Sequence, residues 1–261
     1  MAVAELFTAN ATLIAGCMGS LWLLSLVLRD ASIVDVFWGL GFVAVGCLSF
    51  AVTDGGASTR SRLLVALATV WGLRLAIHLF RRNAGHGEDP RYAAMRRHWG
   101  ARFAWVSLFT VFAFQAVVMW VVSLPLQLGQ VVHGGPLGPL DVAGATLFSV
   151  GFGFEAVGDL QLARFRADPA NAGRVMDRGL WRYTRHPNYF GDFCVWWGLY
   201  AVALSTPYGP WSLAGPVVMS ILLMRVSGVP MLERSIRKRR PGYEDYARHT
   251  SAFFPRRPRP E

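Results

Sequence analysis

The stretch ASIVDVFWGLGFVAVGCLSFAV, residues 31–52, holds a single charged side chain, Asp35, in an otherwise apolar run. A bilayer core takes about 20 mostly apolar helical residues to cross, and this stretch has that length. It therefore predicts a transmembrane helix. The composition of the chain agrees, because 53% of its 261 residues are hydrophobic and 16% are charged, below the roughly 25% charged residues of a soluble domain.

Six further runs have a similar length and composition, and they predict an all-α, polytopic membrane protein with seven transmembrane helices. The expected spans are Thr8 to Leu28, Ala31 to Val52, Leu63 to Phe80, Phe103 to Leu124, Asp141 to Ala163, Tyr189 to Leu204 and Trp211 to Val229. We expect one membrane domain over residues 1–255 and a disordered Arg/Pro tail at 256–261. The first run lacks the basic start and cleavage site of a signal peptide, so we expect it to be retained.

The basic residues predict the orientation of these helices. The chain has 26 Lys and Arg against 16 Asp and Glu, a formal charge of +10, and every basic residue except Lys238 is an arginine. The even-numbered loops contain only Arg60 and Arg62, whereas the odd-numbered loops and the tail hold nearly all the others. The positive-inside rule then places the N-terminus outside and the C-terminus in the cytoplasm. We expect a bacterial-type inner (plasma) membrane.

Several kinds of site have no support in the sequence. The cysteines Cys17, Cys47 and Cys194 lie in apolar runs and predict neither a disulfide framework nor a redox pair. No zinc-protease, serine-esterase or P-loop motif is present. Gly151-Phe152-Gly153 lies inside an expected helix without a preceding strand, which is not a Rossmann arrangement. We therefore expect no metal site and, since the spans leave no room for a separate module, no nucleic-acid partner.

Seven ionisable residues lie within the expected spans, near their cytoplasmic ends. Each costs on the order of 2.5–3.5 kcal/mol at the centre of a membrane helix, so each needs a partner, water or a function. They are Asp35, Arg74, His78, Glu155, Asp159, Asp192 and Arg225. Each can be an ion pair between helices, but their gathering at one face favours a polar chamber open to the cytoplasm. Gln115 is expected to form a helix-to-helix hydrogen bond.

The third and fifth loops add arginines and tyrosines to this face. Arginine binds phosphate bidentately, and tyrosine can stack on a base. Alternatively, the loop arginines face lipid phosphates. The residues concerned include Arg81, Arg82, Arg91, Tyr92, Arg164, Arg166, Arg174, Tyr183, Arg185 and Tyr189.

The segment GLWRYTRHPNYFGD, residues 179–192, resembles the C-terminal signature of the steroid 5α-reductase family, in particular its bacterial membrane branch, domain of unknown function 1295. The likeness covers about residues 31–255 and includes EAVGD (155–159), PGYEDY (241–246) and SAFFP (251–255). It implies an oxidoreductase that uses NADPH, with helices one to four on the substrate side and helices five to seven with the cytoplasmic loops on the cofactor side.

The resemblance also implies roles for single residues. Asp35 falls where the reductases keep a glutamate that hydrogen-bonds the substrate carbonyl, and Trp71 stands in place of its partner tyrosine. Tryptophan is no phenolic proton donor, so Arg74 or His78 would supply the second polar group. Implied cofactor contacts are Arg91, Tyr92, Glu155, Asp159, Arg164, Arg166, Tyr183, Asn188 and Asp192. We add Arg174, Arg185, Tyr189, Glu233, Tyr243, Tyr246 and His186, the last as a ligand contact or a structural cap.

The Arg-His-Pro-x-Tyr-x-Gly core, with Glu233-Arg234, Tyr243 and Tyr246, is also similar to the isoprenylcysteine carboxyl methyltransferases, which use S-adenosylmethionine. The motif alone does not choose between the two. Charge favours the reductase, because arginines can neutralise the pyrophosphate and 2′-phosphate of NADPH, whereas the methyl donor is a cationic sulfonium without phosphate. A non-enzymatic lipid-binding protein is a third possibility if neither nucleotide binds.

The favoured activity is reduction of the C=C bond of a lipophilic α,β-unsaturated carbonyl, such as a 3-oxo-Δ4 steroid or a similar lipid. Hydride passes from NADPH to the β-carbon, and a donor in a dry pocket stabilises the charge on the carbonyl oxygen. Asp35 is that donor if protonated and an acceptor if Arg74 lies close, which the sequence leaves open. We expect the substrate to enter from the membrane lipids. The natural substrate, the stereochemistry and the oligomeric state are left open.

Overall fold

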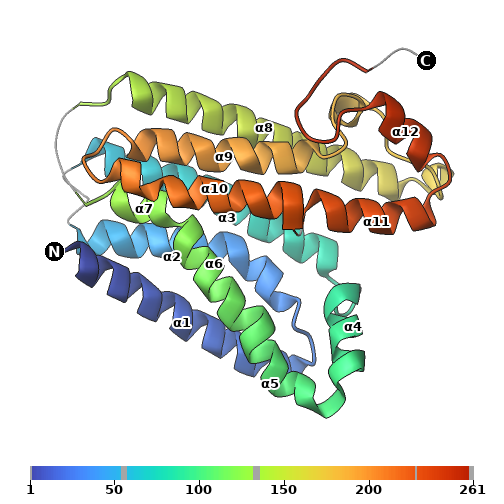
Figure 1. The fold of residues 1–261 in the computed structure, drawn as a ribbon, viewed down its shortest axis with the longest axis horizontal. Coiled ribbons are helices and arrows are strands. Elements are labelled where there is room, and N and C mark those ends of the chain that lie inside the picture. The colour runs from blue at the N-terminus through green and yellow to red at the C-terminus, as the bar shows by residue number, and fades with distance from the viewer. Residues whose placement is uncertain (1, 54–57, 132–135, 227, 259–261) are drawn as a thin grey trace. The chain divides into compact units, whose positions relative to one another are not determined.

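The computed structural model describes residues 2–53, 58–131, 136–226 and 228–258, and these contain helices and no strand. Six stretches are long and apolar enough to cross a membrane: Val3–Leu28, Ile33–Val52, Thr59–Asn83, Pro90–Val122, Pro139–Ala167 and Gly209–Val226. The predicted all-α fold is confirmed for the described residues (Figure 1), and these long apolar helices support a membrane-embedded chain. The remaining predicted span corresponds to α9 (Pro187–Ala203), whose 17 residues are at the lower limit for spanning. The count of seven and the orientation stay predictions.

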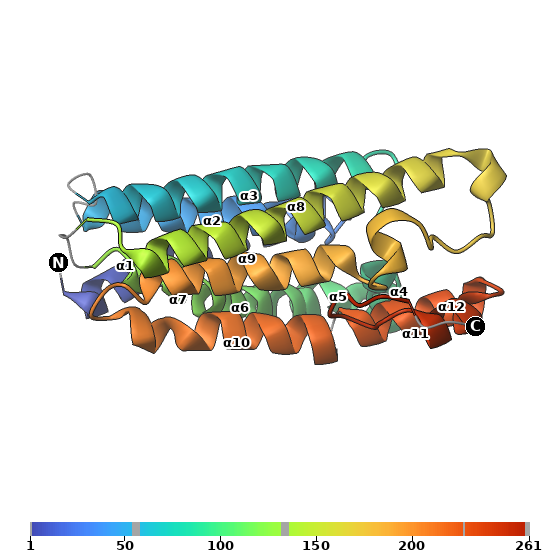
Figure 2. The same ribbon diagram turned by 90° about the horizontal axis from the view of Figure 1, so that it is seen from above.

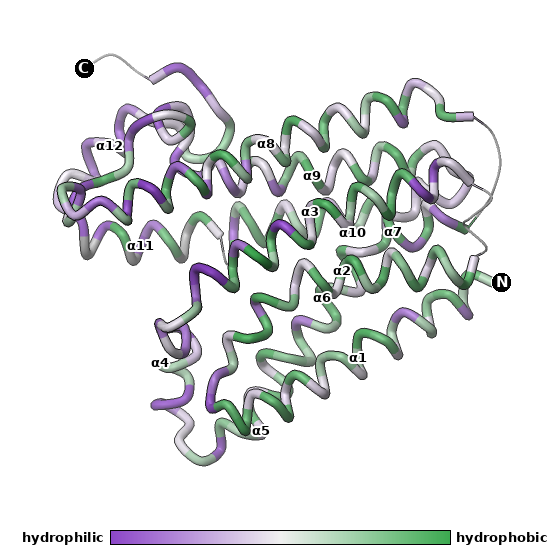
Figure 3. The backbone as a smooth tube through the Cα atoms, turned by 180° about the vertical axis from the view of Figure 1, so that it is seen from behind, coloured by the Kyte–Doolittle hydropathy of each residue, from purple (hydrophilic) through white to green (hydrophobic). Residues whose placement is uncertain are grey.

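The helices form two compact units. The first unit comprises Met1–Asp141 with Val202–Gly215, and the second comprises Val142–Ala201 with Pro216–Glu261. Figure 3 shows hydrophobic residues along the long helices and hydrophilic residues gathered on α4, α11 and α12. The bounds are α1 Val3–Leu28, α2 Ile33–Val52, α3 Thr59–Asn83, α4 Pro90–Trp99, α5 Phe103–Ser107, α6 Phe114–Val122, α7 Leu124–Leu128, α8 Pro139–Ala167, α10 Ala214–Ile221, α11 Val229–Arg239 and α12 Tyr243–His249.

The backbones of α2 and α3 touch in the first unit. A Cβ added to Gly39 would lie 2.1 Å from the carbonyl oxygen of Gly72, and one added to Gly72 would lie 2.4 Å from that of Gly39. Any larger residue at either position would push the helices apart. Beside this crossing, the rings of Phe42 and Trp71 pack with their centroids 5.8 Å apart.

A buried ion pair closes one end of the first unit. The guanidinium of Arg60, in the first turn of α3, donates to both carboxylate oxygens of Asp141, over 2.7 and 2.9 Å. Asp141 also accepts from the backbone N–H of Gly138 at 2.7 Å. Since both side chains are buried, each charge depends on the other.

Two of the predicted spans are irregular, and one predicted loop is helical. Residues 103–124 include a π-helical segment at Leu108–Ala113, and the last span includes one at Leu222–Val226. The stretch from Pro90 to Trp99, predicted as part of a loop, forms α4. Asp89 caps this helix by accepting from the N–H of Arg91 at 2.9 Å, and Pro90 fits the first turn.

In the second unit α8 and α9 pack antiparallel (Figure 2). A Cβ on Gly191 would lie 2.5 Å from the carbonyl oxygen of Gly151 and from the amide nitrogen of Glu155, so glycine is required there. A second close approach lies further along, where a Cβ on Gly198 would be 2.7 Å from the carbonyl oxygen of Gly144. These glycines bring the first turn of α9 against Glu155 of α8.

The chain after α12 is attached to the segment before α9. Arg185 N–H donates to Ser251 O at 2.9 Å, and the Thr184 hydroxyl donates to Phe253 O at 2.7 Å. The N–H of Arg256 donates to Tyr183 O at 2.9 Å. The tail at 256–261 was predicted to be disordered, but its first residue, Arg256, is hydrogen-bonded to the rest of the chain. Its last three positions, 259–261, lie outside the described residues.

Candidate functional site

Asp35 lies in the first turn of α2, where α4 supplies partners for both of its carboxylate oxygens. Arg91 Nη2 donates to Oδ2 at 2.6 Å, and the Tyr92 hydroxyl donates to Oδ1 at 2.8 Å. The Asp35 side chain is 16% exposed, so water competes little for these bonds. The arrangement is a carboxylate that orients a buried phenol at one end of an apolar helix.

Further hydrogen bonds hold the phenol from the other side. Gln115 of α6 donates from Nε2 to the Tyr92 oxygen at 3.2 Å, and its Oε1 accepts from the indole N–H of Trp38. Gln115 therefore links α2, α4 and α6, which confirms its predicted role as a helix-to-helix hydrogen bond. One lone pair of the Tyr92 oxygen is left for a further donor.

The loop before α4 fixes the position of Arg91 and Tyr92. The Glu88 carboxylate accepts from the N–H of Ala31 at 2.9 Å and from Arg96 at 2.8 and 2.9 Å. Burial alone would raise the pKa of Glu88, but the hydrogen bonds from Arg96 and Ala31 outweigh it and lower the pKa below its usual value. Glu88 thus stays ionised and ties α4 to the turn between α1 and α2.

Asp35 therefore has a tyrosine partner, Tyr92, which the resemblance to the reductases did not identify as such. Trp71, predicted in the position of that tyrosine, is buried against Phe42, and the phenol comes from Tyr92. Arg91 and Tyr92, which the resemblance implies near the cofactor phosphates, bond to Asp35. Arg74 and His78 lie half-buried on α3, each with interactions of its own. Their catalytic roles, like that of Trp71, stay predictions.

Four predicted cofactor residues of the second unit belong to the contact between α8 and α9. Asn188 Nδ2 donates to Asp159 Oδ1 at 3.1 Å. Glu155 and Asp159 are buried, and the Gly191 backbone packs directly on Glu155. Asp192 follows Gly191 in the second turn of α9 and is half-buried. The cofactor contacts assigned to these four residues stay predictions.

A set of contacts among Arg185, His186 and Glu233, called the clamp below, holds the end of α12. Glu233 Oε1 accepts from Arg185 Nε at 2.8 Å and lies 3.2 Å from His186 Nε2. Burial alone would raise the pKa of Glu233, but these hydrogen bonds outweigh it and lower the pKa to about 2. Arg185 Nη1 also donates to the carbonyls of Ala247 and Thr250, both at 2.8 Å. The guanidinium of Arg185 is thus occupied by protein partners.

His186 takes a structural place in this clamp. It is 1% exposed, and its ring stacks on that of Tyr189 with centroids 5.5 Å apart. Burial, partly offset by Glu233, lowers the pKa of His186 below its usual value. The ring is therefore neutral at pH 7 and donates from Nε2 to the carboxylate of Glu233, so of the two roles left open by the sequence the geometry favours the structural one.

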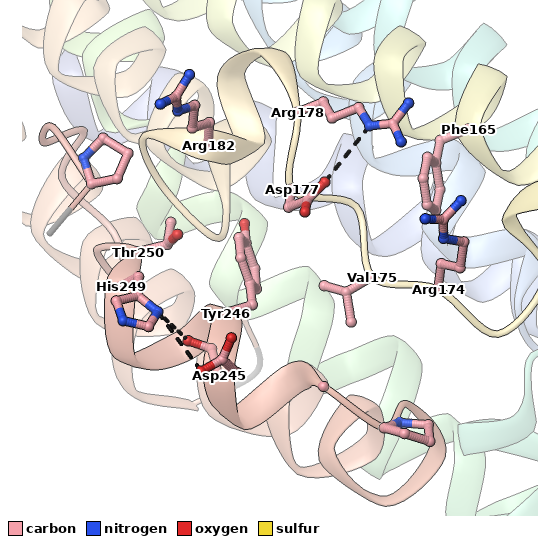
Figure 4. Close-up of a pocket in the computed structure, with 13 residues that line it drawn as sticks. Phe165, Arg174, Val175, Asp177, Arg178, Arg182, Asp245, Tyr246, His249 and Thr250 are labelled. Atoms are coloured by element: carbon pink, nitrogen blue, oxygen red, sulfur yellow. Dashed lines mark hydrogen bonds and ion pairs between the residues drawn. The ribbon is translucent and has the colours of Figure 1, made fainter. Parts of the chain in front are cut away.

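A cavity of about 650 Å³ lies beside α12 in the second unit. Figure 4 shows Arg174, Arg178 and Arg182 on the chain segment that faces His249 and Asp245. A smaller pocket of about 90 Å³ shares Phe165, Arg174, Val175 and Tyr246 with this cavity. Its lining includes Trp181, Tyr243 and Tyr246, with Arg166, Arg174, Arg185 and Arg240.

Five of the predicted cofactor residues thus line the smaller pocket: Arg166, Arg174, Arg185, Tyr243 and Tyr246. Arg164 and Tyr183 are exposed and line neither of the two hollows. The sequence did not single out Arg178, Arg182 or Arg240, although all three lie in the basic segments expected at the cytoplasmic face. Only their position in these basic segments could have indicated them, and that position does not distinguish an arginine that lines a cavity from one that does not.

The donor set of these two hollows suits a ligand with both phosphates and an aromatic base. Guanidinium groups bind phosphate bidentately, and tyrosine and tryptophan rings supply flat apolar walls. The volume of the larger cavity falls in the roughly 300–1,000 Å³ range of small-molecule sites. Across residues 2–53, 58–131, 136–226 and 228–258, no group of three or more His, Cys, Asp or Glu side chains is placed to hold a metal ion.

Comparison with known proteins finds one family and one relative that resemble this chain. An uncharacterized protein of Schizosaccharomyces pombe is 23% identical over 266 residues, covering 90% of this chain and 76% of its own. No solved structure matches the chain. The family model described as "Protein of unknown function (DUF1295)" matches residues 21–250. The match includes α2 to α12 and both residues of the Asp35–Tyr92 pair, and the chain belongs to this family.

Proposed function

We propose that this protein reduces the C=C bond of a lipophilic α,β-unsaturated carbonyl compound with NADPH. The observation that carries the proposal is the hydrogen bond of 2.8 Å between the Tyr92 phenol and the Asp35 carboxylate. The resemblance to steroid 5α-reductases implies a carboxyl group and a tyrosine at the substrate carbonyl, and Tyr92 supplies the phenol that Trp71 cannot. A 3-oxo-Δ4 steroid or a similar lipid is the substrate class.

Tyr92 is the proton donor of this proposal, and Asp35 positions it. Both oxygens of Asp35 accept hydrogen bonds, as those of an ionised carboxylate do. The Tyr92 hydroxyl has one proton, which it donates to Asp35 Oδ1. A substrate carbonyl that replaced Asp35 as the acceptor would receive this hydrogen bond, which would grow stronger as negative charge builds on the carbonyl oxygen. Gln115 Nε2, which donates to the phenol oxygen, would stabilise charge on that oxygen when its proton is shared.

The proposed cofactor site lies in the second unit. NADPH, when bound, supplies a hydride to the β-carbon of the enone and becomes NADP⁺. Tyr243 and Tyr246 would flank the base, and Arg166 and Arg174 would neutralise phosphates. The resulting enolate takes up a proton at its α-carbon, with water as the final source, so that one hydride and one proton are added across the C=C bond.

Ligand binding to the purified protein tests the proposal. Titration with NADPH, NADH and S-adenosylmethionine, followed by quenching of tryptophan emission, should show tightest binding of NADPH. Asp35→Asn should abolish turnover and leave the NADPH affinity within about a factor of two. Asp168→Asn, an exposed aspartate outside both hollows, is the matched control and should keep both properties. Tight binding of S-adenosylmethionine without binding of NADPH would refute the reductase.

A further inference from the structure

Two arginines of the larger cavity are not explained by the predicted cofactor contacts. Arg178 and Arg182 line it together with Arg174, which also lines the smaller aromatic pocket. Among the described residues, the guanidinium groups of Arg174 and Arg182 have no hydrogen-bond or ion-pair partner, and that of Arg178 has only Asp177 at 3.9 Å. Three arginines without strong partners among the described residues therefore line one hollow; Figure 4 labels all three.

The charge of this hollow suits a doubly charged phosphate. Its lining carries three guanidinium groups and two carboxylates, those of Asp177 and Asp245, so the positive charges outnumber the negative ones. Asp245 lies 3.9 Å from His249 Nδ1. A phosphate monoester carries a charge of about −1.5 to −2 at pH 7 and offers three acceptor oxygens, so it can bind more than one arginine at a time.

The two hollows share part of their lining, as neighbouring sites for the base and the 2′-phosphate of one adenosine would. The smaller pocket has the aromatic walls for a base, and Arg174, Val175, Phe165 and Tyr246 are common to both linings. In NADPH the 2′-phosphate is attached to the ribose that carries the adenine. A base in the smaller pocket would thus place a 2′-phosphate close to the shared wall of the larger cavity.

We infer that Arg178 and Arg182 bind the 2′-phosphate of NADPH and thereby set the preference for NADPH over NADH. The inference rests on the proposed function, because it assigns part of the same cofactor to a further pair of residues. It gives Arg178 and Arg182 a role in specificity, whereas Arg185 in the neighbouring clamp serves the fold.

Binding of four probes to the full-length protein in detergent tests the inference. The probes are NADPH, NADH, adenosine 2′,5′-bisphosphate and AMP, each followed by tryptophan quenching. Arg182→Ala should weaken binding of NADPH and of the bisphosphate roughly 10- to 100-fold and leave NADH and AMP nearly unchanged. The double variant Arg178→Ala/Arg182→Ala should abolish the preference. Arg248→Ala, an exposed arginine of α12 outside the cavity lining, is the control and should keep it.

The outcomes separate this inference from the proposed function. If the unaltered protein binds NADPH tightly and the double variant keeps the same preference over NADH, the inference is wrong and the reductase proposal stands. If the unaltered protein binds neither dinucleotide, both fail. Equal weakening of NADPH and NADH would show a general effect on the fold and would also overturn the inference. Arg182→Lys keeps a charge at this position, and we expect it to restore part of the NADPH preference lost in Arg182→Ala.

Discussion

Replacement of Glu233 by glutamine should destabilise the second unit, because it removes the charge that binds Arg185. The Glu233 side chain is 11% exposed. Its pKa falls from 4.5 to about 2 on folding. At about 1.4 kcal/mol per pKa unit, this shift corresponds to about 3 kcal/mol of stabilisation at neutral pH.

The sign of the shift predicts how the effect depends on pH. A carboxyl group with a lowered folded pKa stabilises the fold fully above its unfolded pKa, here 4.5, and loses that contribution as the pH falls toward 2. We therefore expect the Glu233→Gln variant to be less stable than the unaltered protein by up to about 3 kcal/mol at pH 7. The difference should shrink below pH 4.5.

Denaturant unfolding of the detergent-solubilised protein, followed by circular dichroism, measures this difference. Glu244→Gln is the matched control, since Glu244 also pairs with an arginine, Arg237, at 2.9 Å but is 60% exposed. Such exposed pairs contribute less than about 1 kcal/mol. The reasoning fails if Glu233→Gln is as mild as Glu244→Gln at pH 7, or if its effect is the same at pH 7 and pH 3.

Two further predictions concern packing and buried charge. Arg60→Met should destabilise the first unit by about 3–5 kcal/mol because it leaves the buried Asp141 carboxylate without its cation, and Arg60→Met/Asp141→Leu should recover most of that loss in the same unfolding assay. Gly191→Ala should lower the melting temperature, because its Cβ would lie 2.5 Å from backbone atoms of α8, whereas Gly153→Ala, with nothing within 4 Å, should be neutral or stabilising by up to about 1 kcal/mol. A melting temperature that falls in Gly153→Ala or is unchanged in Gly191→Ala would contradict the packing of α8 on α9.

The long apolar helices could be predicted because burial in lipid demands continuous apolar runs. Hydropathy does not detect short amphipathic helices, so α4, α11 and α12 fell in predicted loops and tail. For α4 the Asp89-Pro90 pair was a usable signal of a helix start. The π-helical segment at Leu108–Ala113 could not be predicted from the apolar pattern, since its residues resemble those around it. The segment at Leu222–Val226 contains the charged Arg225, but a charge does not by itself indicate a π-helix.

The candidate site was only partly predictable for a similar reason. A charge in a membrane helix is rare enough to mark Asp35, but its partner Tyr92 lies in another helix. The hydrogen bond from the N–H of Ala31 to Glu88, two residues before α4, holds this helix near the start of α2, and the sequence pattern does not reveal such a contact. Likewise, Arg182 and Arg185 are three positions apart in one basic segment, yet one lines a cavity and the other clamps the C-terminal segment. Residue type could not tell these roles apart.

Transfer of deuterium tests the reductase proposal most directly. The purified protein would be given NADPH carrying deuterium at the reactive carbon of the nicotinamide, together with a lipid extract of its own membrane, and the lipids would be compared by mass spectrometry. We predict a lipid carbonyl compound that gains one deuterium and one proton, and that is not formed by the Asp35→Asn or Tyr92→Phe variants. Absence of deuterium from every lipid, with methyl transfer from S-adenosylmethionine in a parallel sample, would contradict the proposal.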